Sequence, residues 1–278
     1  MEPIEAVEVK RLLLEMLERF TQLCENQGLH YFLDYGTLLG AVRHGGFIPW
    51  DDDVDVMMPR WDYERLYQLF AEKPELLGDE YRLSSYRNAW SSQKSLLTLV
   101  DLRTITKSPN RKKRFYYPLW VDIFPADYMP ETEEEQRRLR WKVAKLTKKV
   151  QLSVCPGYGK IKLLRELSSR MQLPLMAGRL EEIDRLCRSN APSEMLGSYM
   201  AYSSTIKMED CFPAAWFEDT IFIPFEGKLF RAPRDYDKRL RDYYGDYMQP
   251  PPENERVPHF TNAYWVEGLG EKKEWTRG

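Results

Sequence analysis

The sequence predicts an α+β fold, in which a mixed sheet is flanked by helices and carries a helical insertion or subdomain. Three observations predict it. Apolar residues recur with helical spacing over 6–25, and short strand-like segments then alternate with turns over 30–124. The stretch 131–186 has the character of long helices, and strand-like, turn-rich sequence returns from Phe217 onward. We therefore expect helices and strands in the first part of the chain, helices alone in the middle, and strands again at the end.

The composition is that of a folded protein with one main core. The chain has 278 residues, of which 30% are charged and 43% hydrophobic, and its formal net charge is -2. This balance excludes a disordered chain and argues against a generally basic nucleic-acid binder. We expect three parts: a core at 1–130, a helical insertion or subdomain at 131–200, and a C-terminal part at 201–278 that packs back on the core.

Cysteine usage and hydropathy predict a cytoplasmic protein. The four cysteines form no C-x-x-C pair, so reduced thiols in a reducing compartment are expected. The first residues are acidic where a signal peptide is basic, and no apolar run approaches the length of about 18 residues that a membrane-spanning helix needs.

Local signals predict where each element begins and ends. Gly28 is suited to end the first helix, and Pro59 to begin a later one. The expected elements, in order, are a helix at 6–25, a strand at 30–35, a helix at 37–43, a strand at 54–58, a helix from 59 to about 70, strands at 81–86, 95–103 and 119–124, long helices over 131–186 with a break near Pro156-Gly157, and strand-like segments at 220–224 and 225–230.

The acidic run that begins at Asp51 is the most informative segment. Side chains two apart in a strand share a face, so Asp53 and Asp55 point one way while Val54 and Val56 point into the core. Two ionised carboxylates in a partly dry site repel each other, and a divalent cation between them relieves the repulsion. Mg²⁺ suits such a site, with Mn²⁺ as the second choice, because it combines few carboxylates with phosphate oxygens. A solvated acidic turn is the alternative, which the two valines and the upstream glycine turn disfavour.

A calcium-binding loop also begins with aspartates at alternate positions. Here Val56 stands where that loop has glycine, and Asp62 stands where it has glutamate. We therefore reject a calcium loop.

A phosphate site is predicted at Gly36 and Thr37, between a strand and a helix. Free backbone N–H groups and a hydroxyl at a helix N-terminus hold phosphate, assisted by the helix dipole. Arg43 and His44 follow one or two turns later and are candidates to contact the same anion. A surface role for Arg43 is the alternative.

A third carboxylate is expected from a neighbouring strand. Asp122 lies within an apolar segment, where a lone aspartate is costly unless it is paired or metal-bound. Asp127 and Asp101 are rivals, but Asp127 follows Pro125 in an expected turn, and Asp101 is expected to pair with Arg103.

Three stretches, at 35–56, 120–125 and 243–248, resemble the LicD family, and the similarity ends at Pro250-Pro251-Pro252 and His259. That family includes bacterial phosphocholine transferases and is related to fukutin-type ribitol-phosphate transferases. The resemblance implies a nucleotidyltransferase-like fold, in which Asp53, Asp55 and Asp122 are the catalytic and metal-binding acids. It makes 1–130 the catalytic core, and the C-terminal part at 201–278 is expected to complete the site.

The resemblance also implies a reaction. A CDP-linked alcohol, for which CDP-choline is our first expectation, binds with its diphosphate between Gly36-Thr37 and Mg²⁺. A sugar hydroxyl of a cell-surface glycan or teichoic acid precursor attacks the distal phosphorus, and CMP leaves. Asp122 is a candidate acceptor of the hydroxyl proton, and His259 a candidate contact to phosphate or acceptor. If choline is transferred, aromatic side chains should surround its ammonium group. Aromatic candidates near the motifs, each with core packing as the alternative, are Trp50, Trp61, Trp120 and Tyr31.

The stretch 136–165 is rich in lysine and arginine and lacks acids. It is either a solvated helix face or a surface that contacts an anionic lipid-linked glycan or the inner face of the membrane. Its basic residues are Arg137, Arg138, Arg140, Lys142, Lys145, Lys148, Lys149, Lys160, Lys162 and Arg165.

Two other functions stay open at this point. A nucleotide-sugar-dependent glycosyltransferase also uses an Asp-x-Asp pair with a metal ion, and it would release UDP or GDP in place of CMP. A non-catalytic binding protein would bind no metal at Asp53 and Asp55 when the donor is present.

Overall fold

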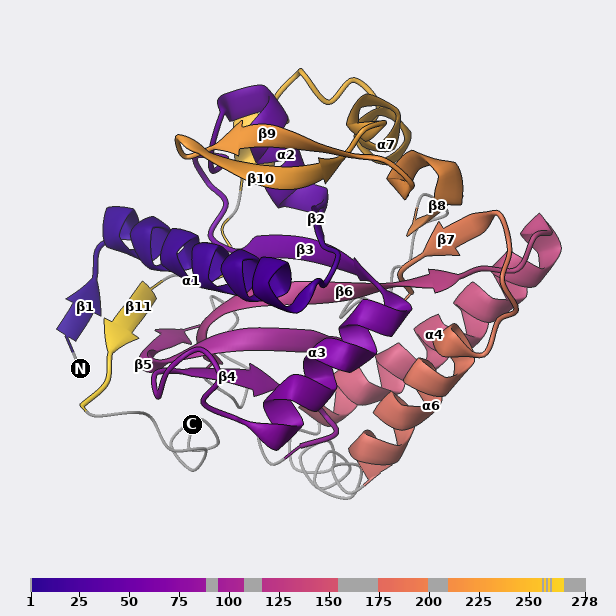
Figure 1. Cartoon of the computed structure of the whole chain (residues 1–278), viewed down its shortest axis with the longest axis horizontal. Helices are drawn as coiled ribbons and strands as arrows, with labels where there is room; N and C mark the ends of the chain where they lie inside the picture. The colour runs from indigo at the N-terminus through magenta and orange to yellow at the C-terminus, as the bar shows by residue number, and fades with distance from the viewer. Residues whose placement is uncertain are drawn as a thin grey trace, which may run out of the picture.

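A mixed β-sheet forms the centre of the molecule, and helices α1 (Ala6–Gln27) and α3 (Arg60–Glu72) lie across one of its faces (Figure 1). The computed structural model describes residues 2–88, 95–107, 117–154, 175–199, 210–256, 258, 260 and 262–267. The predicted α+β class is confirmed.

Helices and strands follow one another in nearly the predicted order. The remaining helices are α2 (Tyr35–His44), α4 (Glu133–Val154), α6 (Met176–Arg188) and α7 (Tyr236–Tyr244), with short 3-10 helices η3 (Ala214–Phe217) and η4 (Glu253–Glu255). The strands are β1 (Glu2–Ile4), β2 (Phe32–Leu33), β3 (Val54–Pro59), β4 (Tyr81–Ser84), β5 (Leu97–Lys107), β6 (Tyr117–Tyr128), β7 (Met195–Gly197), β8 (Cys211–Pro213), β9 (Thr220–Phe225), β10 (Lys228–Pro233) and β11 (Asn262–Trp265).

The pairing of three central strands positions the acidic residues. Along the main path of the sheet the order is β1-β11-β5-β6-β3-β2, with β4 on β5 and β7 on β6. β3 and β6 are parallel, with Asp55 opposite Asp122, whereas β5 and β6 are antiparallel, with Thr98 opposite Asp122. Asp55, Asp122 and Thr98 therefore form one row across three strands.

The main hydrophobic core lies between the sheet and helices α1 and α3, which cover one of its faces. On β3, Val54, Val56 and Met58 are completely buried and belong to the same core cluster as the apolar side of α1. Helix α1 ends where Gly28 adopts a left-handed conformation, with φ 63, which glycine tolerates without strain. Because side chains alternate along a strand, the core on this face leaves Asp53 and Asp55 on the other.

The expected turn at Asp127 is wrong. β6 continues through Pro125 to Tyr128, and Asp127 is a buried strand residue. Pro125 is tolerated because it pairs only with β3. β5 pairs with β6 as far as Ile123, and β7 pairs with β6 only at Asp127 and Tyr128. The predicted pair of Asp101 with Arg103 is confirmed, at 2.7 Å.

A buried network of ion pairs joins α6 to the sheet. Arg60 donates two hydrogen bonds to Asp127, at 2.6 and 2.7 Å, and one to Asp184 of α6 at 3.0 Å. Arg87 binds Glu64 and Asp184 in the same way. Burial alone raises the pKa of Glu64, but the hydrogen bonds and charges of Arg87 and Arg60 outweigh it and lower that pKa. Asp127 is thus explained as a structural ion-pair partner.

The predicted helical region includes α4 and α6, which pack against each other in Figure 1. The expected break near Pro156-Gly157 lies outside the described residues. Cys24, Cys187 and Cys211 are buried and free. Among the helices that the structure describes, none combines the length and apolar character needed to cross a membrane.

Candidate functional site

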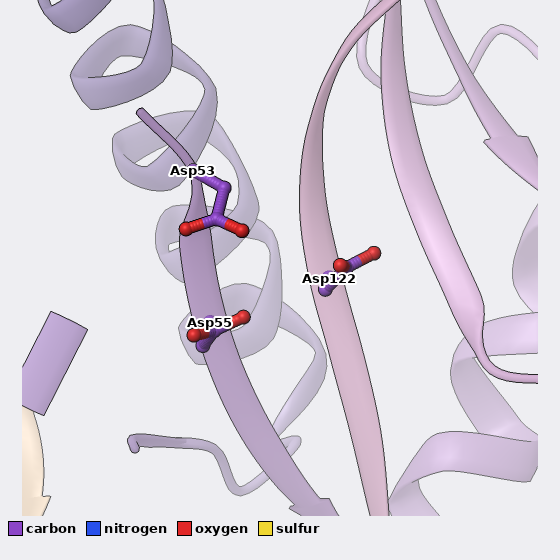
Figure 2. Close-up of side chains that lie close together, drawn as sticks. All are labelled: Asp53, Asp55 and Asp122. Atoms are coloured by element: carbon purple, nitrogen blue, oxygen red, sulfur yellow. The ribbon is translucent and has the colours of Figure 1, made fainter. Parts of the chain in front are cut away.

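Three aspartate carboxylates meet on the face of the sheet opposite α1 and α3. Asp53 precedes β3, Asp55 follows on that strand, and Asp122 comes from the adjacent β6 (Figure 2). One oxygen from each lies within 4.8 Å of the others. Asp53 and Asp55 are half-buried, and Asp122 is only 7% exposed. The parallel pairing of β3 with β6 brings these groups together from distant parts of the chain.

The donor set suits a hard divalent cation. All three side chains offer carboxylate oxygen, the ligand that Mg²⁺ and Mn²⁺ prefer, and no thiol or imidazole belongs to the cluster that the described residues form. Three negative charges this close repel one another, and a cation held among them would relieve the repulsion. Asp53, Asp55 and Asp122 therefore fit the group that the sequence predicts.

The N-terminus of α2 lies beside these acids. Asp34 precedes the helix, and its carbonyl accepts the first helical hydrogen bond, from the N–H of Leu38. The N–H groups of Gly36 and Thr37 come before that bond and lie at the helix end, where they favour an anion. A Cβ on Gly36 would lie 2.6 Å from Oδ2 of Asp51, so a larger residue there would displace a carboxylate of the acidic run.

Two hydrogen bonds hold this helix end against β3. The backbone N–H of Asp55 donates to Oγ1 of Thr37 at 2.8 Å. The backbone N–H of Asp34 donates to the carbonyl of Asp55 at 3.3 Å. The predicted phosphate-binding and metal-binding groups are consequently fixed relative to each other through the backbone of Asp55.

A buried ion pair beneath α2 escaped the sequence analysis. Arg239 of α7 and Asp34 are each 1% exposed, and the guanidinium donates to the two carboxylate oxygens at 3.2 and 3.0 Å. The guanidinium also lies 5.2 Å from the ring centre of Tyr35 and 5.0 Å from that of Tyr243. Arg239 sits in a strongly polar helix, where an arginine carries no local signal of burial.

Aromatic rings from three segments line one side of the acidic cluster. Tyr35 lies 4.8 Å from Phe124 and 5.2 Å from Tyr243, and Tyr243 lies 4.8 Å from Tyr244. Tyr244 is 37% exposed. Burial raises the pKa of the Tyr243 hydroxyl most. The carboxylates of Asp210, Asp34 and Asp55 raise it further, against the opposing charge of Arg239. This side of the site therefore combines aromatic rings with the carboxylates and with the guanidinium of Arg239.

The aromatic residues expected from the sequence lie mostly elsewhere. Trp61 is 59% exposed on α3, and Tyr31 is buried in the core. Trp50 packs against Arg256, with the guanidinium 4.8 Å from the ring centre. Trp120 does reach the acids, since its indole N–H donates to Oδ2 of Asp122 at 3.1 Å.

Arg43 and His44 lie at the opposite end of α2 from Gly36, about 10 Å away along the helix axis. Arg43 donates to the carbonyl of Tyr247 at 2.8 Å and so ties α2 to the C-terminal segment. Burial and the neighbouring positive charges of Arg43 and Lys10 lower the pKa of His44. The candidate His259 lies outside the described residues.

Comparison with known proteins bears directly on this site. Residues 28–149, which include all three aspartates and the N-terminus of α2, match the family described as LicD/FKTN/FKRP, nucleotidyltransferase domain. These residues form a LicD-family domain. The predicted resemblance and the nucleotidyltransferase-like fold are thereby confirmed, and the relatives of this chain include proteins named as phospho-alcohol transferases.

Similarity to individual LicD-family proteins extends beyond that domain. The chain is 29% identical over 270 residues to the lipopolysaccharide cholinephosphotransferase LicD of Haemophilus influenzae, which covers 91% of this chain and 95% of that protein. It is 48% identical over 70 residues to the human ribitol 5-phosphate transferase FKRP, or 25% of this chain and 14% of that protein.

Proposed function

We propose that this chain transfers phosphocholine from CDP-choline to a sugar hydroxyl of a cell-surface glycan or teichoic acid precursor and releases CMP. The observation that carries the proposal is the convergence of Asp53, Asp55 and Asp122 beside the N-terminus of α2, within a LicD-family domain. Similarity to a cholinephosphotransferase along nearly its whole length supports phosphocholine as the transferred group.

Asp53, Asp55 and Asp122 would hold Mg²⁺ in this reaction. A bound Mg²⁺ supplies neutralisation of phosphate charge as it develops. The N–H groups of Gly36 and Thr37 bind the donor diphosphate and orient the distal phosphorus. The acceptor oxygen forms a new P–O bond, the P–O bond to CMP breaks, and the hydroxyl proton passes to a carboxylate, for which Asp122 is the candidate. Alignment and charge compensation are the protein's main contributions.

Tyr244 is the aromatic residue best placed to contact a quaternary ammonium group. The residue is 37% exposed and its ring lies 4.8 Å from that of Tyr243, while burial and then the charges of Tyr243 and Asp55 raise the pKa of its hydroxyl. An aromatic ring close to negative charge is the environment that choline favours. The faces of Tyr35 and Tyr243 are already in contact with Arg239.

A donor screen that measures CMP release tests the reaction. The purified chain is incubated with Mg²⁺, a glycan acceptor and CDP-choline, CDP-ethanolamine, CDP-ribitol or CDP-glycerol, with UDP- and GDP-sugars in parallel. We expect CMP from CDP-choline and a loss of at least about 100-fold in rate for Asp53→Asn, because a key electrostatic group is removed. Asp79→Asn, at an exposed position, is the matched control and should retain the wild-type rate. Release of UDP or GDP alone, or an unimpaired Asp53→Asn variant, contradicts the proposal.

The head group is tested at Tyr244 with two variants. Tyr244→Leu removes the ring and should raise KM for CDP-choline about 5-fold or more, as expected for the loss of a desolvated cation–π contact. Tyr244→Phe keeps the ring face and should stay close to the wild type. Equal effects of both variants on KM would contradict choline recognition by this ring.

We also propose that α4 contacts an anionic membrane surface or a lipid-linked acceptor. Successive turns of the helix present a basic stripe around Trp141, which is 63% exposed. The ring of Trp141 lies 4.7 Å from Nζ of Lys145. A tryptophan among lysines suits the boundary between lipid headgroups and acyl chains. The exposed basic residues of the stripe are Arg138, Lys142, Lys145 and Lys149.

Vesicle sedimentation at low salt tests this contact. Binding to vesicles that contain anionic lipid should fall when Lys142, Lys145 and Lys149 are all changed to Gln. Changing the exposed Lys73, Lys228 and Lys238 to Gln removes the same charge elsewhere and should change binding less. Equal losses from the two triple variants, or no binding by the wild type, would contradict a role for α4.

A further inference from the structure

We propose that Trp120 is a positioning residue, which holds the carboxylate of Asp122 in the orientation that a divalent cation requires, and that Phe260 couples this arrangement to the acidic run before β3. The inference rests on the metal site of the proposed function and goes beyond it, because neither residue is itself a metal ligand in that proposal.

Both oxygens of Asp122 accept hydrogen bonds from neighbouring side chains. Trp120, two residues earlier on the same face of β6, donates its indole N–H to Oδ2 at 3.1 Å. Thr98, directly opposite on β5, donates its hydroxyl to Oδ1 at 3.3 Å. A carboxylate oxygen has two lone-pair directions, so one donor on each oxygen fixes the plane of the group and still allows it to bind a cation. Partners of this kind orient metal ligands in proteins.

Two aromatic rings hold the indole of Trp120 in place. Its ring lies 6.1 Å from that of Tyr117 at an interplanar angle of 87°, and 5.9 Å from that of Phe260 at 62°. Both are edge contacts, which are favourable for aromatic pairs. The rotation of the indole about its side-chain bonds is therefore restricted, and the direction of its N–H with it.

Phe260 connects the two acid-bearing segments. Its ring contacts Trp120, which binds Asp122, while its backbone N–H donates to Oδ2 of Asp52 at 3.2 Å. Asp52 directly precedes Asp53. One residue near the C-terminus thus contacts both sides of the cluster, and its 7% exposure shows that it is packed into the fold. Displacement of Phe260 should move Asp53 and Asp122 together.

Mn²⁺ titration of the full chain without donor, followed by the EPR signal of free Mn²⁺, tests the inference independently of catalysis. Trp120→Phe removes the N–H and keeps an aromatic ring. We expect it to weaken Mn²⁺ binding about 10- to 100-fold, the usual effect of losing a group that orients a ligand. Thr98→Val removes the other donor at nearly constant volume and should act in the same direction. Phe260→Leu should have a smaller effect, since it retains an apolar side chain and the backbone N–H.

Trp61→Phe is the matched control, because it makes the same change at an exposed position on α3 and should leave Mn²⁺ affinity unchanged. Circular dichroism shows whether each variant is folded. If Trp120→Phe does not fold, the Mn²⁺ affinity of Thr98→Val decides whether the donors to Asp122 position it for a cation. Wild-type affinity in folded Trp120→Phe and Thr98→Val would overturn the inference and leave the metal site intact. No Mn²⁺ binding by the wild type would overturn both.

Discussion

Replacing Arg239 by Met should destabilise the fold far more than the loss of an ordinary surface charge. The substitution keeps most of the side chain's apolar length but removes the cation that lies against Asp34. Arg239 and Asp34 are both 1% exposed and share two hydrogen bonds, at 3.2 and 3.0 Å. The carboxylate of Asp34 would stay buried without its partner. Breaking a buried pair in this way costs about 3–5 kcal/mol of unfolding free energy.

That loss should lower the melting temperature by roughly 6–20 °C for a chain of this size. Urea unfolding followed by circular dichroism measures the loss of unfolding free energy. Arg241→Met is the control on the same helix: Arg241 pairs with Asp237 at 2.8 Å, but both side chains are largely exposed, so the midpoint should hardly move. Adding Asp34→Asn to Arg239→Met should restore part of the stability, because it removes the uncompensated charge. Equal unfolding midpoints for Arg239→Met and Arg241→Met would refute the reasoning.

Three further predictions concern the α2 N-terminus and the ion-pair network. Gly36→Ala should lower kcat/KM by up to about 100-fold with little change in melting temperature. The new methyl group displaces the carboxylate of Asp51, whose Oδ2 lies 2.6 Å from the Cβ position. Gly178→Ala, in open space on α6, is the control and should raise stability by about 0.5–1 kcal/mol and leave the rate unchanged. Thr37→Val should cost about 1–3 kcal/mol in urea unfolding because the N–H of Asp55 loses its acceptor, whereas Thr37→Ser keeps an acceptor and should cost less. Folding lowers the pKa of Glu64 from its ordinary value of 4.5, so the unfolded chain binds more protons in this range. The contribution of Glu64 to stability is therefore present above pH 4.5 and is lost as the pH falls through the lower, folded pKa. Glu64→Gln should flatten the dependence of the unfolding free energy on pH in this acidic range. An unchanged pH profile in Glu64→Gln would contradict the last prediction.

The amino-acid sequence alone determined the order of the elements from α1 to β6 and the sidedness of β3, but it did not predict β1, β7, β8, α7 or β11. Helical spacing located α1, and the alternation of Val54 and Val56 with the aspartates placed Asp53 and Asp55 on one face, because side-chain direction in helices and strands follows from local backbone geometry. Asp122 could be chosen because a single aspartate in an apolar strand needs a partner. Their roles as metal ligands stay predictions until metal binding is measured.

The tertiary structure alone decided which distant segments meet. The parallel pairing of β3 with β6 set Asp55 opposite Asp122, and the strand pairing on either side of Pro125 allowed β6 to continue where local rules predicted a turn. The Arg239–Asp34 pair and the contact of Phe260 with Trp120 join the C-terminal part of the chain to the site. Such contacts depend on long-range packing and desolvation, which leave no periodic pattern in the residues around them, and for this reason the sequence could not reveal them.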